Sequence, residues 1–360
     1  MGERKRIGIL TSGGDCAGLN AVIRAVVYRA RGTYGWEVLG IRQATLGLMT
    51  RPPKAMPLEI EKVDSLLTAG GTMLGTTNKG DPFAFPMPDG TVRDRSEDII
   101  AGYHELGLEA IIGIGGDGSM AILRRIAQQG GLNMVAIPKT IDNDVGVTEH
   151  SIGFDTAVNT ATEALDRLHF TAASHSRVMI LEVMGRDAGH IAISAGIAGG
   201  ADVILIPEIA YTVDNVCHKI KERQEQGKNY SLVIVSEAVR TETGEQVMNT
   251  NRLGQSRYGG IGQYLADEIC NRSGAETRVT VLGHIQRGGT PSPLERLIAS
   301  AFGVAAVDLI VEGKYDQMVT WQNRRVVSVP ITEAIAKYSA VDPNGTLVKT
   351  ARGLGIYLGD

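Results

Sequence analysis

Two glycine-rich segments that follow predicted strands are suited to binding phosphate. Residues 11–15 read Thr-Ser-Gly-Gly-Asp after the apolar run 6–10, and residues 115–119 read Gly-Gly-Asp-Gly-Ser after the run 110–114. Adjacent glycines let backbone N–H groups face an anion, and the positive end of a following helix adds to the attraction. One such loop alone could be a plain strand-to-helix turn, but the pair favours phosphate binding. Ser119 could cap its helix and also contact a phosphate.

Carboxylates stand within or after these loops. Asp117 is the candidate ligand for Mg²⁺, which takes one or two carboxylates together with phosphate oxygens. Residues 140–144, Thr-Ile-Asp-Asn-Asp, carry Asp142 and Asp144 two positions apart. On an extended segment both side chains would face the same way, so that one could take a proton from an attacking hydroxyl while the other serves the metal side. The alternative is an Asx-type turn, in which these side chains bond their own backbone.

Several arginines stand at the starts or ends of predicted strands, namely Arg177, Arg186, Arg278 and Arg287. Arginine binds phosphate bidentately and keeps its charge, so these residues could hold the phosphate of a phosphorylated substrate. Each of them taken alone could equally form a surface salt bridge. His284 could be a ligand or a structural residue.

Short apolar runs, several of them rich in Val and Ile, are typical of strands buried on both faces of a parallel sheet. They occupy residues 6–10, 110–114, 134–137, 178–183, 203–206, 232–235 and 279–282. Helical patterns lie between them at 19–31, 119–129, 156–170, 213–226 and 261–272. This alternation predicts an α/β doubly wound architecture. Ligands of open α/β sheets bind beyond the carboxyl ends of the strands, where the polar segments stand.

Composition excludes several classes of protein. The chain has 360 residues, of which 43% are hydrophobic, enough for two lobes. A net charge of −4 gives no basic surplus for nucleic acid or acidic membranes. The three cysteines are far apart and form no disulfide framework or CxxC site, as expected in a reducing cytosol. No apolar run approaches the ~20 residues of a membrane span, and the first is too short for a signal peptide, so we expect a cytoplasmic protein.

Two common nucleotide-binding motifs are absent from the sequence. The pattern GxxxxGK[ST] does not occur, which argues against a P-loop enzyme, and GxGxxG does not follow the first strand, which argues against a dinucleotide-binding dehydrogenase.

Taken in order, these segments closely resemble the 6-phosphofructokinase family. The matching pieces are TSGGD at 11–15, GGDGS at 115–119, TIDND at 140–144, IGFDTA at 152–157, EVMGR at 182–186, IAGGAD at 197–202 and LGHIQRGG at 282–289. The resemblance implies two doubly wound, Rossmann-like lobes with mainly parallel sheets and the active site in the cleft between them. Residues 1–153 with about 286–336 would form the donor-binding lobe, and residues 154–285 with about 337–360 the sugar-phosphate-binding lobe.

The resemblance also implies the reaction and the roles of the residues. The enzyme would use ATP and Mg²⁺ to phosphorylate the C1 hydroxyl of fructose 6-phosphate, giving fructose 1,6-bisphosphate and ADP. Asp142 would be the general base, and Thr140, Asp144 and Arg186 would act at the reacting end of the sugar. The remaining sugar contacts would come from Met184, Gly185 and Glu237, and the contacts to the 6-phosphate from Arg177, Arg278, His284 and Arg287. The donor side would comprise Gly14, Asn78, Lys79, Gly116, Gly118 and Ser119, with Asp117 on Mg²⁺.

In bacterial members some arginines of the 6-phosphate site come from a neighbouring subunit, so the resemblance implies a homotetramer. Arg177 and Arg278 match those positions. The effector site departs from the family pattern. Arg24 and Lys228 match basic effector-binding positions, but Tyr28, His169 and Gln226 replace other basic residues. We therefore expect ADP and phosphoenolpyruvate not to regulate this protein as they regulate the well-known bacterial enzyme.

Gly118 and Lys139 stand at the positions that sort ATP from pyrophosphate use in this family. Pyrophosphate enzymes typically carry Asp at the first position and Lys at the second. Gly118 leaves room for the α-phosphate of a nucleotide, whereas Asp would fill that space and repel the phosphate. Lys139 suits either donor, so the sequence predicts ATP. Arg42 and Ile122 replace a Tyr and a Gly of the usual adenine pocket, so adenine would be held differently.

Two alternatives stay open at this point. The first is the same reaction with pyrophosphate as the donor. The second is a non-catalytic, phosphosugar-binding regulatory subunit. Loss of the base or of the metal acid would indicate such a subunit, but Asp142 and Asp117 are both present.

Overall fold

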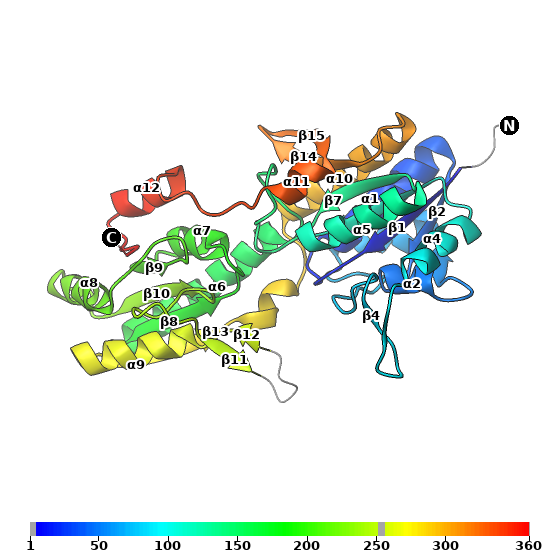
Figure 1. Cartoon of the computed structure of the whole chain (residues 1–360). Coiled ribbons are helices and arrows are strands. Elements are labelled where there is room, and N and C mark those ends of the chain that lie inside the picture. The colour runs from blue at the N-terminus through cyan, green and yellow to red at the C-terminus, as the bar shows by residue number, and fades with distance from the viewer. Residues whose placement is uncertain (1–4, 251–255, 360) are drawn as a thin grey trace. The chain divides into compact units, whose positions relative to one another are not determined.

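The computed structural model describes residues 5–250 and 256–359 and divides the chain into two compact units (Figure 1). Unit 1 comprises Met1–Thr140, Val145–Asp155 and Arg287–Tyr338. Unit 2 comprises Ile141–Asp144, Thr156–Gln286 and Ser339–Asp360. The chain therefore returns to unit 1 and then to unit 2 after the long middle segment.

Unit 1 is built on a seven-stranded sheet with the order β15-β14-β7-β6-β1-β2-β3. Neighbours from β14 to β2 are parallel, and the edge strands β15 and β3 are antiparallel to theirs. The central strands β6 and β7 are buried throughout, which explains their unbroken apolar sequences. The strands are β1 Arg6–Thr11, β2 Glu37–Ile41, β3 Ala55–Pro57, β6 Ala110–Gly115, β7 Met134–Pro138, β14 Gln317–Gln322 and β15 Arg325–Pro330; β4 Phe85–Pro86 and β5 Val92–Arg93 form a separate ribbon.

Helices cover this sheet. They are α1 Leu19–Val27, the π-helix η1 Tyr28–Thr33, α2 Thr45–Met49, α3 Ile60–Val63, the 3₁₀ turn η2 Asp64–Thr68, α4 Ser96–Glu105, α5 Asp117–Gly130, α10 Pro293–Val311 and α11 Ile331–Ala336. Helices α1 and α10 approach closely at Gly303, where a Cβ would lie 2.7 Å from the Cβ of Ala25. Residues of α2, α4, α5 and α11 share one core cluster with the central strands.

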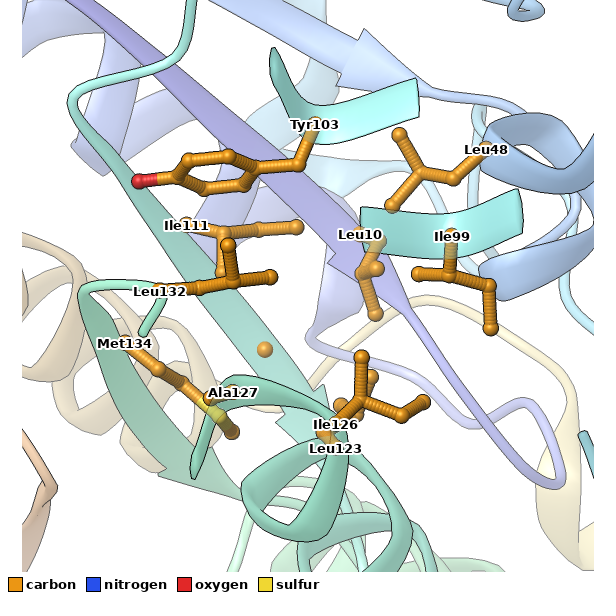
Figure 2. Close-up of a pocket in the computed structure, with 11 residues that line it drawn as sticks. Leu10, Leu48, Ile99, Tyr103, Ile111, Leu123, Ile126, Ala127, Leu132 and Met134 are labelled. Atoms are coloured by element: carbon orange, nitrogen blue, oxygen red, sulfur yellow. The ribbon is translucent and has the colours of Figure 1, made fainter. Parts of the chain in front are cut away.

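This core cluster encloses a cavity of about 20 Å³ (Figure 2). Leu10 and Ile111 of the sheet face it together with Tyr103 of α4 and Leu123 of α5. A void of this size is near the lower limit for one water molecule, and its walls are apolar. The cavity is therefore a packing defect of the core and no candidate site for a substrate.

Unit 2 contains a smaller, wholly parallel sheet with the order β13-β8-β10-β9. Its elements are α6 Phe154–His175, β8 Val178–Val183, α7 His190–Ala198, β9 Val203–Leu205, α8 Val213–Glu225, β10 Ser231–Ser236, the hairpin strands β11 Met248–Thr250 and β12 Ser256–Tyr258, α9 Ile261–Ser273, β13 Thr277–Val281, the 3₁₀ turn η3 Gly283–Arg287 and α12 Thr346–Gly353. Apolar residues of β8, β9 and β10 pack against α8 and α9 in one core cluster.

The predicted α/β class with mainly parallel sheets is confirmed. Each apolar run that was predicted as a strand overlaps one, although β13, a half-exposed edge strand, begins two residues earlier than expected. The predicted helix 19–31 is regular only to Val27 and continues as η1. Elements that the sequence patterns did not indicate include β2, β3, α7, α10 and the β14–β15 hairpin.

Candidate active site

The two glycine-rich loops of unit 1 lie next to each other. From β1 the chain runs to β2 on one side and later to β6 on the other, so the loops after β1 and β6 meet where the strand order reverses. The backbone N–H of Ser12 donates to the carbonyl oxygen of Ile114 at 2.8 Å. A side chain at Gly115 would lie 2.6 Å from the Cβ of Ser119. Such a reversal is where open α/β sheets bind ligands, so these loops form a candidate phosphate cradle.

A third loop is attached to this cradle. Gly13, in the left-handed region at φ 84°, donates its N–H to the carbonyl oxygen of Thr77 at 2.9 Å. The hydroxyl of Thr76 donates to the carbonyl oxygen of Gly13 at 2.7 Å. The next residues, Asn78 and Lys79, are exposed. These bonds place the predicted donor-binding residues of this loop beside the cradle.

Two cations lie against the cradle. Lys139 is only 5% exposed, and its Nζ donates to the carbonyl oxygen of Gly14 at 2.6 Å. Arg287 donates from Nη1 to the carbonyl oxygen of Asp15 at 3.2 Å. A Cβ at Gly14 would lie 2.7 Å from the same Nη1, so a side chain there would displace the guanidinium group. The sequence predicted Arg287 for the 6-phosphate of the sugar, and this contact with the donor loop was not foreseen.

The helix α5 begins at the second loop. Its N-cap residue is Gly116, and no side chain caps the helix, so the prediction that Ser119 is the cap is wrong. Ser119 lies inside the first turn because the helix already begins at Asp117. A Cβ at Gly118 would meet no atom within 4 Å, which leaves open space beside the cradle.

Asp117 is the candidate metal ligand in this first turn. Among the described residues no three His, Cys, Asp or Glu side chains converge. A single carboxylate beside a phosphate cradle still fits Mg²⁺, since phosphate oxygens and water complete its coordination.

Asp142 and Asp144 are both buried in unit 2, with 7% and 4% exposure. Of the two conformations considered for this segment, the extended one is not observed, because Asn143 between the two acids adopts the left-handed conformation at φ 53° and bends the chain. Arg186 approaches Asp144, with 3.7 Å between Nη1 and Oδ2. The two acids are therefore held by local backbone geometry that their spacing alone did not reveal.

Glu237 and Arg186 form a second part of this acidic region. Arg186 is another non-glycine residue with left-handed backbone, at φ 52°, and its N–H donates to Oε1 of Glu237 at 3.2 Å. Strained residues of this kind concentrate at functional sites. Burial, together with the negative charge of Asp142, raises the pKa of Glu237 to about 7. The neighbouring Gly185 is required because a Cβ there would lie 2.4 Å from the carbonyl oxygen of Ala188.

Comparison with known proteins identifies the family. A family model described as phosphofructokinase matches residues 6–310, which is most of the chain. The chain belongs to the phosphofructokinase family. The resemblance noted in the sequence is thereby confirmed.

Individual members of the family are similar to this chain over its full length. A Nostoc sp. protein named ATP-dependent 6-phosphofructokinase 1 is 77% identical, and a Synechocystis sp. protein of the same name is 73% identical, each over 100% of both chains. The crystal structure of Pichia pastoris phosphofructokinase in the T-state matches with a TM-score of 0.81 and 29% identity. That match covers 93% of this chain and 36% of the Pichia chain.

Two of the arginines predicted for the 6-phosphate, Arg177 and Arg278, lie away from Met184 within unit 2. Arg177 directly precedes β8 and Arg278 is the second residue of β13, whereas Met184 follows the far end of β8. A strand of six residues spans roughly 20 Å. Both guanidinium groups instead bind Oε1 of Glu276, at 2.9 Å from Arg177 and 2.5 Å from Arg278. His284 is exposed on η3, beyond the other end of β13.

The two cations that the sequence predicted at an effector site already have carboxylate partners. Arg24 donates to Asp64, from Nη2 to Oδ1 at 3.4 Å, and its guanidinium stacks on the ring of Tyr28. The hydroxyl of Tyr28 donates to the same carboxylate at 2.5 Å. Lys228 donates from Nζ to Oδ1 of Asp202 at 3.1 Å. An anionic effector would have to compete with Asp64 or Asp202 for these cations.

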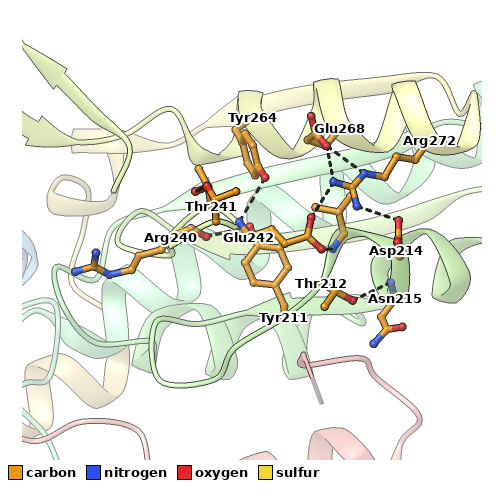
Figure 3. Close-up of polar contacts among 12 residues, drawn as sticks. Tyr211, Thr212, Asp214, Asn215, Arg240, Thr241, Glu242, Tyr264, Glu268 and Arg272 are labelled. Carbon is orange, nitrogen blue, oxygen red and sulfur yellow. Dashed lines mark hydrogen bonds and ion pairs between the residues drawn. The ribbon is translucent and has the colours of Figure 1, made fainter. Parts of the chain in front are cut away.

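Another dense set of polar contacts in unit 2 is structural (Figure 3). Arg272 of α9 binds Asp214 of α8, Glu242 and Glu268 at 2.7–2.9 Å. These hydrogen bonds raise the pKa of Arg272 further above its ordinary value. The cluster ties α8 and α9 to the loop after β10. No described helix is long and apolar enough to cross a membrane.

Proposed function

We propose that this protein transfers the γ-phosphoryl group of ATP to the C1 hydroxyl of fructose 6-phosphate, giving fructose 1,6-bisphosphate and ADP in glycolysis. The observation that carries the proposal is the 77% and 73% identity, over the whole chain, to proteins named ATP-dependent 6-phosphofructokinase. Phosphoryl transfer depends mainly on positioning and charge neutralisation, and both halves of the chain carry groups suited to these tasks.

Unit 1 would bind the donor. Backbone N–H groups around Gly14 and Gly116, with the N-terminal turn of α5, would surround its phosphates, and Lys139 and Arg287 add positive charge to the same loop. Asn78 and Lys79 would contact the donor from the attached loop, and Ser119 from the first turn of α5. Asp117 would hold Mg²⁺, which supplies positive charge to the donor phosphates when bound. The open space at Gly118 is compatible with the α-phosphate of a nucleotide.

Unit 2 would bind and activate the acceptor. Asp142 would accept the proton of the C1 hydroxyl as the bond to phosphorus forms, and Asp144 and Thr140 would orient the reacting end of the sugar. Met184, Gly185 and Arg186 would line the sugar site, and Glu237 would hydrogen-bond a hydroxyl group. The burial of both acids keeps bulk water from competing for their oxygens.

The 6-phosphate would require a second copy of the chain. His284 would contribute from the same chain, and Arg287, despite its contact with the donor loop, remains a candidate. Arg177 and Arg278 lie a strand length from Met184, so we propose that they serve the acceptor site of a neighbouring subunit in a cytoplasmic homotetramer. There the phosphate would replace the carboxylate of Glu276 as the partner of both guanidinium groups.

The test is turnover of fructose 6-phosphate with Mg²⁺ and either ATP or pyrophosphate, followed by coupled detection of fructose 1,6-bisphosphate. We expect kcat/KM to favour ATP by well over tenfold. The buried cation Lys139 would suit a small, highly charged donor, so pyrophosphate is the alternative. Faster turnover with pyrophosphate would overturn the choice of donor, and no turnover with either would overturn the proposed reaction.

A further inference from the structure

Gln286 is buried at the point where the strand order of unit 2 reverses. After β8 the chain forms β9 and β10 on one side of β8, and it later forms β13 on the other side. The segments that follow β8 and β13 therefore face each other. Gln286 belongs to η3, which follows β13, and is 1% exposed. Its Oε1 accepts the backbone N–H of Met184, which follows β8, at 2.8 Å. This side chain therefore bridges the crevice where a sheet of this kind binds its ligand.

The bond fixes the start of a strained segment. Met184 leads into Gly185 and then Arg186, whose left-handed backbone persists only if the surrounding structure holds it. On the other side of this segment, the N–H of Arg186 is held by Glu237 at 3.2 Å. Gln286 and Glu237 thus both anchor backbone N–H groups of residues 184–186.

The amide nitrogen of Gln286 differs from the amide oxygen in its hydrogen bonding. Nε2 of Gln286 is buried and has no hydrogen-bond partner among the residues that the structure describes. Burying an amide N–H group without a partner is unfavourable, and few buried polar groups of native proteins lack one. A methionine would fill a similar volume with no polar atom to satisfy.

We propose that Gln286 is a positioning residue for the acceptor. Its Oε1 fixes the Met184–Arg186 backbone for the sugar phosphate, and its Nε2 is paired only when the acceptor binds, through an acceptor oxygen or one bridging water. This inference rests on the proposed function, because it assigns residues 184–186 to the fructose 6-phosphate site. It adds to that function a residue that contributes to acceptor affinity without taking part in the chemistry.

The test compares Gln286→Met and Gln286→Glu with wild type. In the free protein, Gln286→Met loses the bond to Met184 but also removes the unmatched amide group, so the melting temperature should change little. The KM for fructose 6-phosphate should rise about tenfold or more, while kcat and the KM for ATP stay within about threefold. Gln286→Glu keeps an acceptor for Met184 but lacks Nε2, and it should also raise the KM for fructose 6-phosphate.

The matched control is Gln263→Met, which changes an exposed glutamine on α9 of the same unit and should alter neither KM. The stabilisation by fructose 6-phosphate, measured as the ligand-induced rise in melting temperature, should shrink in both Gln286 variants and not in the control. An unchanged KM and an unchanged ligand-induced rise in both variants would overturn the inference. A lower melting temperature with an unchanged KM would show a purely structural role. Failure of wild type to turn over fructose 6-phosphate would instead overturn the proposed function.

Discussion

The stability of the Glu237→Gln variant, compared with that of wild type at the same pH, should increase as the pH rises. Burial raises the pKa of Glu237 from 4.5 to about 7; the charge of Asp142 adds to this effect, and the backbone hydrogen bond from Arg186 opposes it. Below pH 4.5 the carboxyl is protonated in both the folded and the unfolded chain. Between pH 4.5 and 7 the folded state holds a proton that the unfolded state has lost, so this contribution to stability falls as the pH rises. Glutamine does not titrate and escapes that loss.

The size of the effect follows from the two pKa values. Between pH 5.5 and 8.0, a group with pKa 4.5 unfolded and about 7 folded loses at most roughly 2 kcal/mol of stabilisation. In a domain of roughly 150–250 residues, 1 kcal/mol shifts the melting temperature by about 2–4 °C. The difference between Glu237→Gln and wild type should therefore grow by roughly 4–8 °C over this interval, with the variant gaining.

Differential scanning calorimetry of both proteins in matched buffers at pH 5.5 and 8.0 measures this difference. Titration of the other groups cancels because they are common to both proteins. Glu225→Gln, which changes an exposed carboxylate on α8 of the same unit, is the matched control and should show no such growth. A constant or shrinking difference for Glu237→Gln would refute the burial argument.

Further changes test the reaction, the subunit arrangement, the donor and regulation. Asp142→Asn should lower kcat by at least about 10²–10⁴-fold with little change in fructose 6-phosphate binding, and retention of more than a tenth of wild-type kcat would exclude Asp142 as the base. Arg278→Ala should raise the KM for fructose 6-phosphate and not that for ATP, and mixing it with Asp142→Asn should restore activity in hybrid oligomers; an effect on the ATP KM alone would place Arg278 on the donor side. Gly118→Asp should lose most ATP activity because the new carboxylate enters open space beside the phosphates, and full ATP activity would contradict the steric argument. Saturation curves for fructose 6-phosphate should not become strongly sigmoidal when phosphoenolpyruvate is added, and a strong sigmoidality that ADP fully relieves would contradict this expectation. Asp64→Asn should increase any response to these anions, because it removes the carboxylate that binds Arg24.

The fold could be predicted where the sequence signal is continuous. The runs that became β6, β7, β8 and β10 are apolar on both faces because helices cover both sides of a parallel sheet. The edge strands β3 and β15 carry mixed exposure and no such run, so their pairing depends on tertiary contacts. The helix α7 is apolar all round, which gives it no periodicity to distinguish it from a buried strand.

The candidate site could be predicted as a set of segments but not as a set of contacts. Glycine-rich loops and acids at strand ends indicate which residues gather, since parallel strands end at one edge. The bend at Asn143 was missed because a left-handed residue leaves little trace in the spacing of its neighbours. The contacts of Arg287 with the donor loop and of Gln286 with Met184 join residues about 270 and 100 positions apart. The one sequence signal for the contact between Gln286 and Met184 was the position of Gln286 between His284 and Arg287, two residues predicted to bind the substrate.

The late return of the chain to unit 1 governs the order in which its sheet can be completed during synthesis. The strand β7 ends at Pro138, but its outer neighbour β14 begins only at Gln317. At about 5–20 residues per second, the ribosome needs roughly 10–35 s to make the intervening chain. During that time β7 presents an apolar edge with open backbone groups, a state that favours pairing with other chains. Nascent molecules should therefore depend on chaperones or dilution until the β14–β15 hairpin emerges and closes this edge.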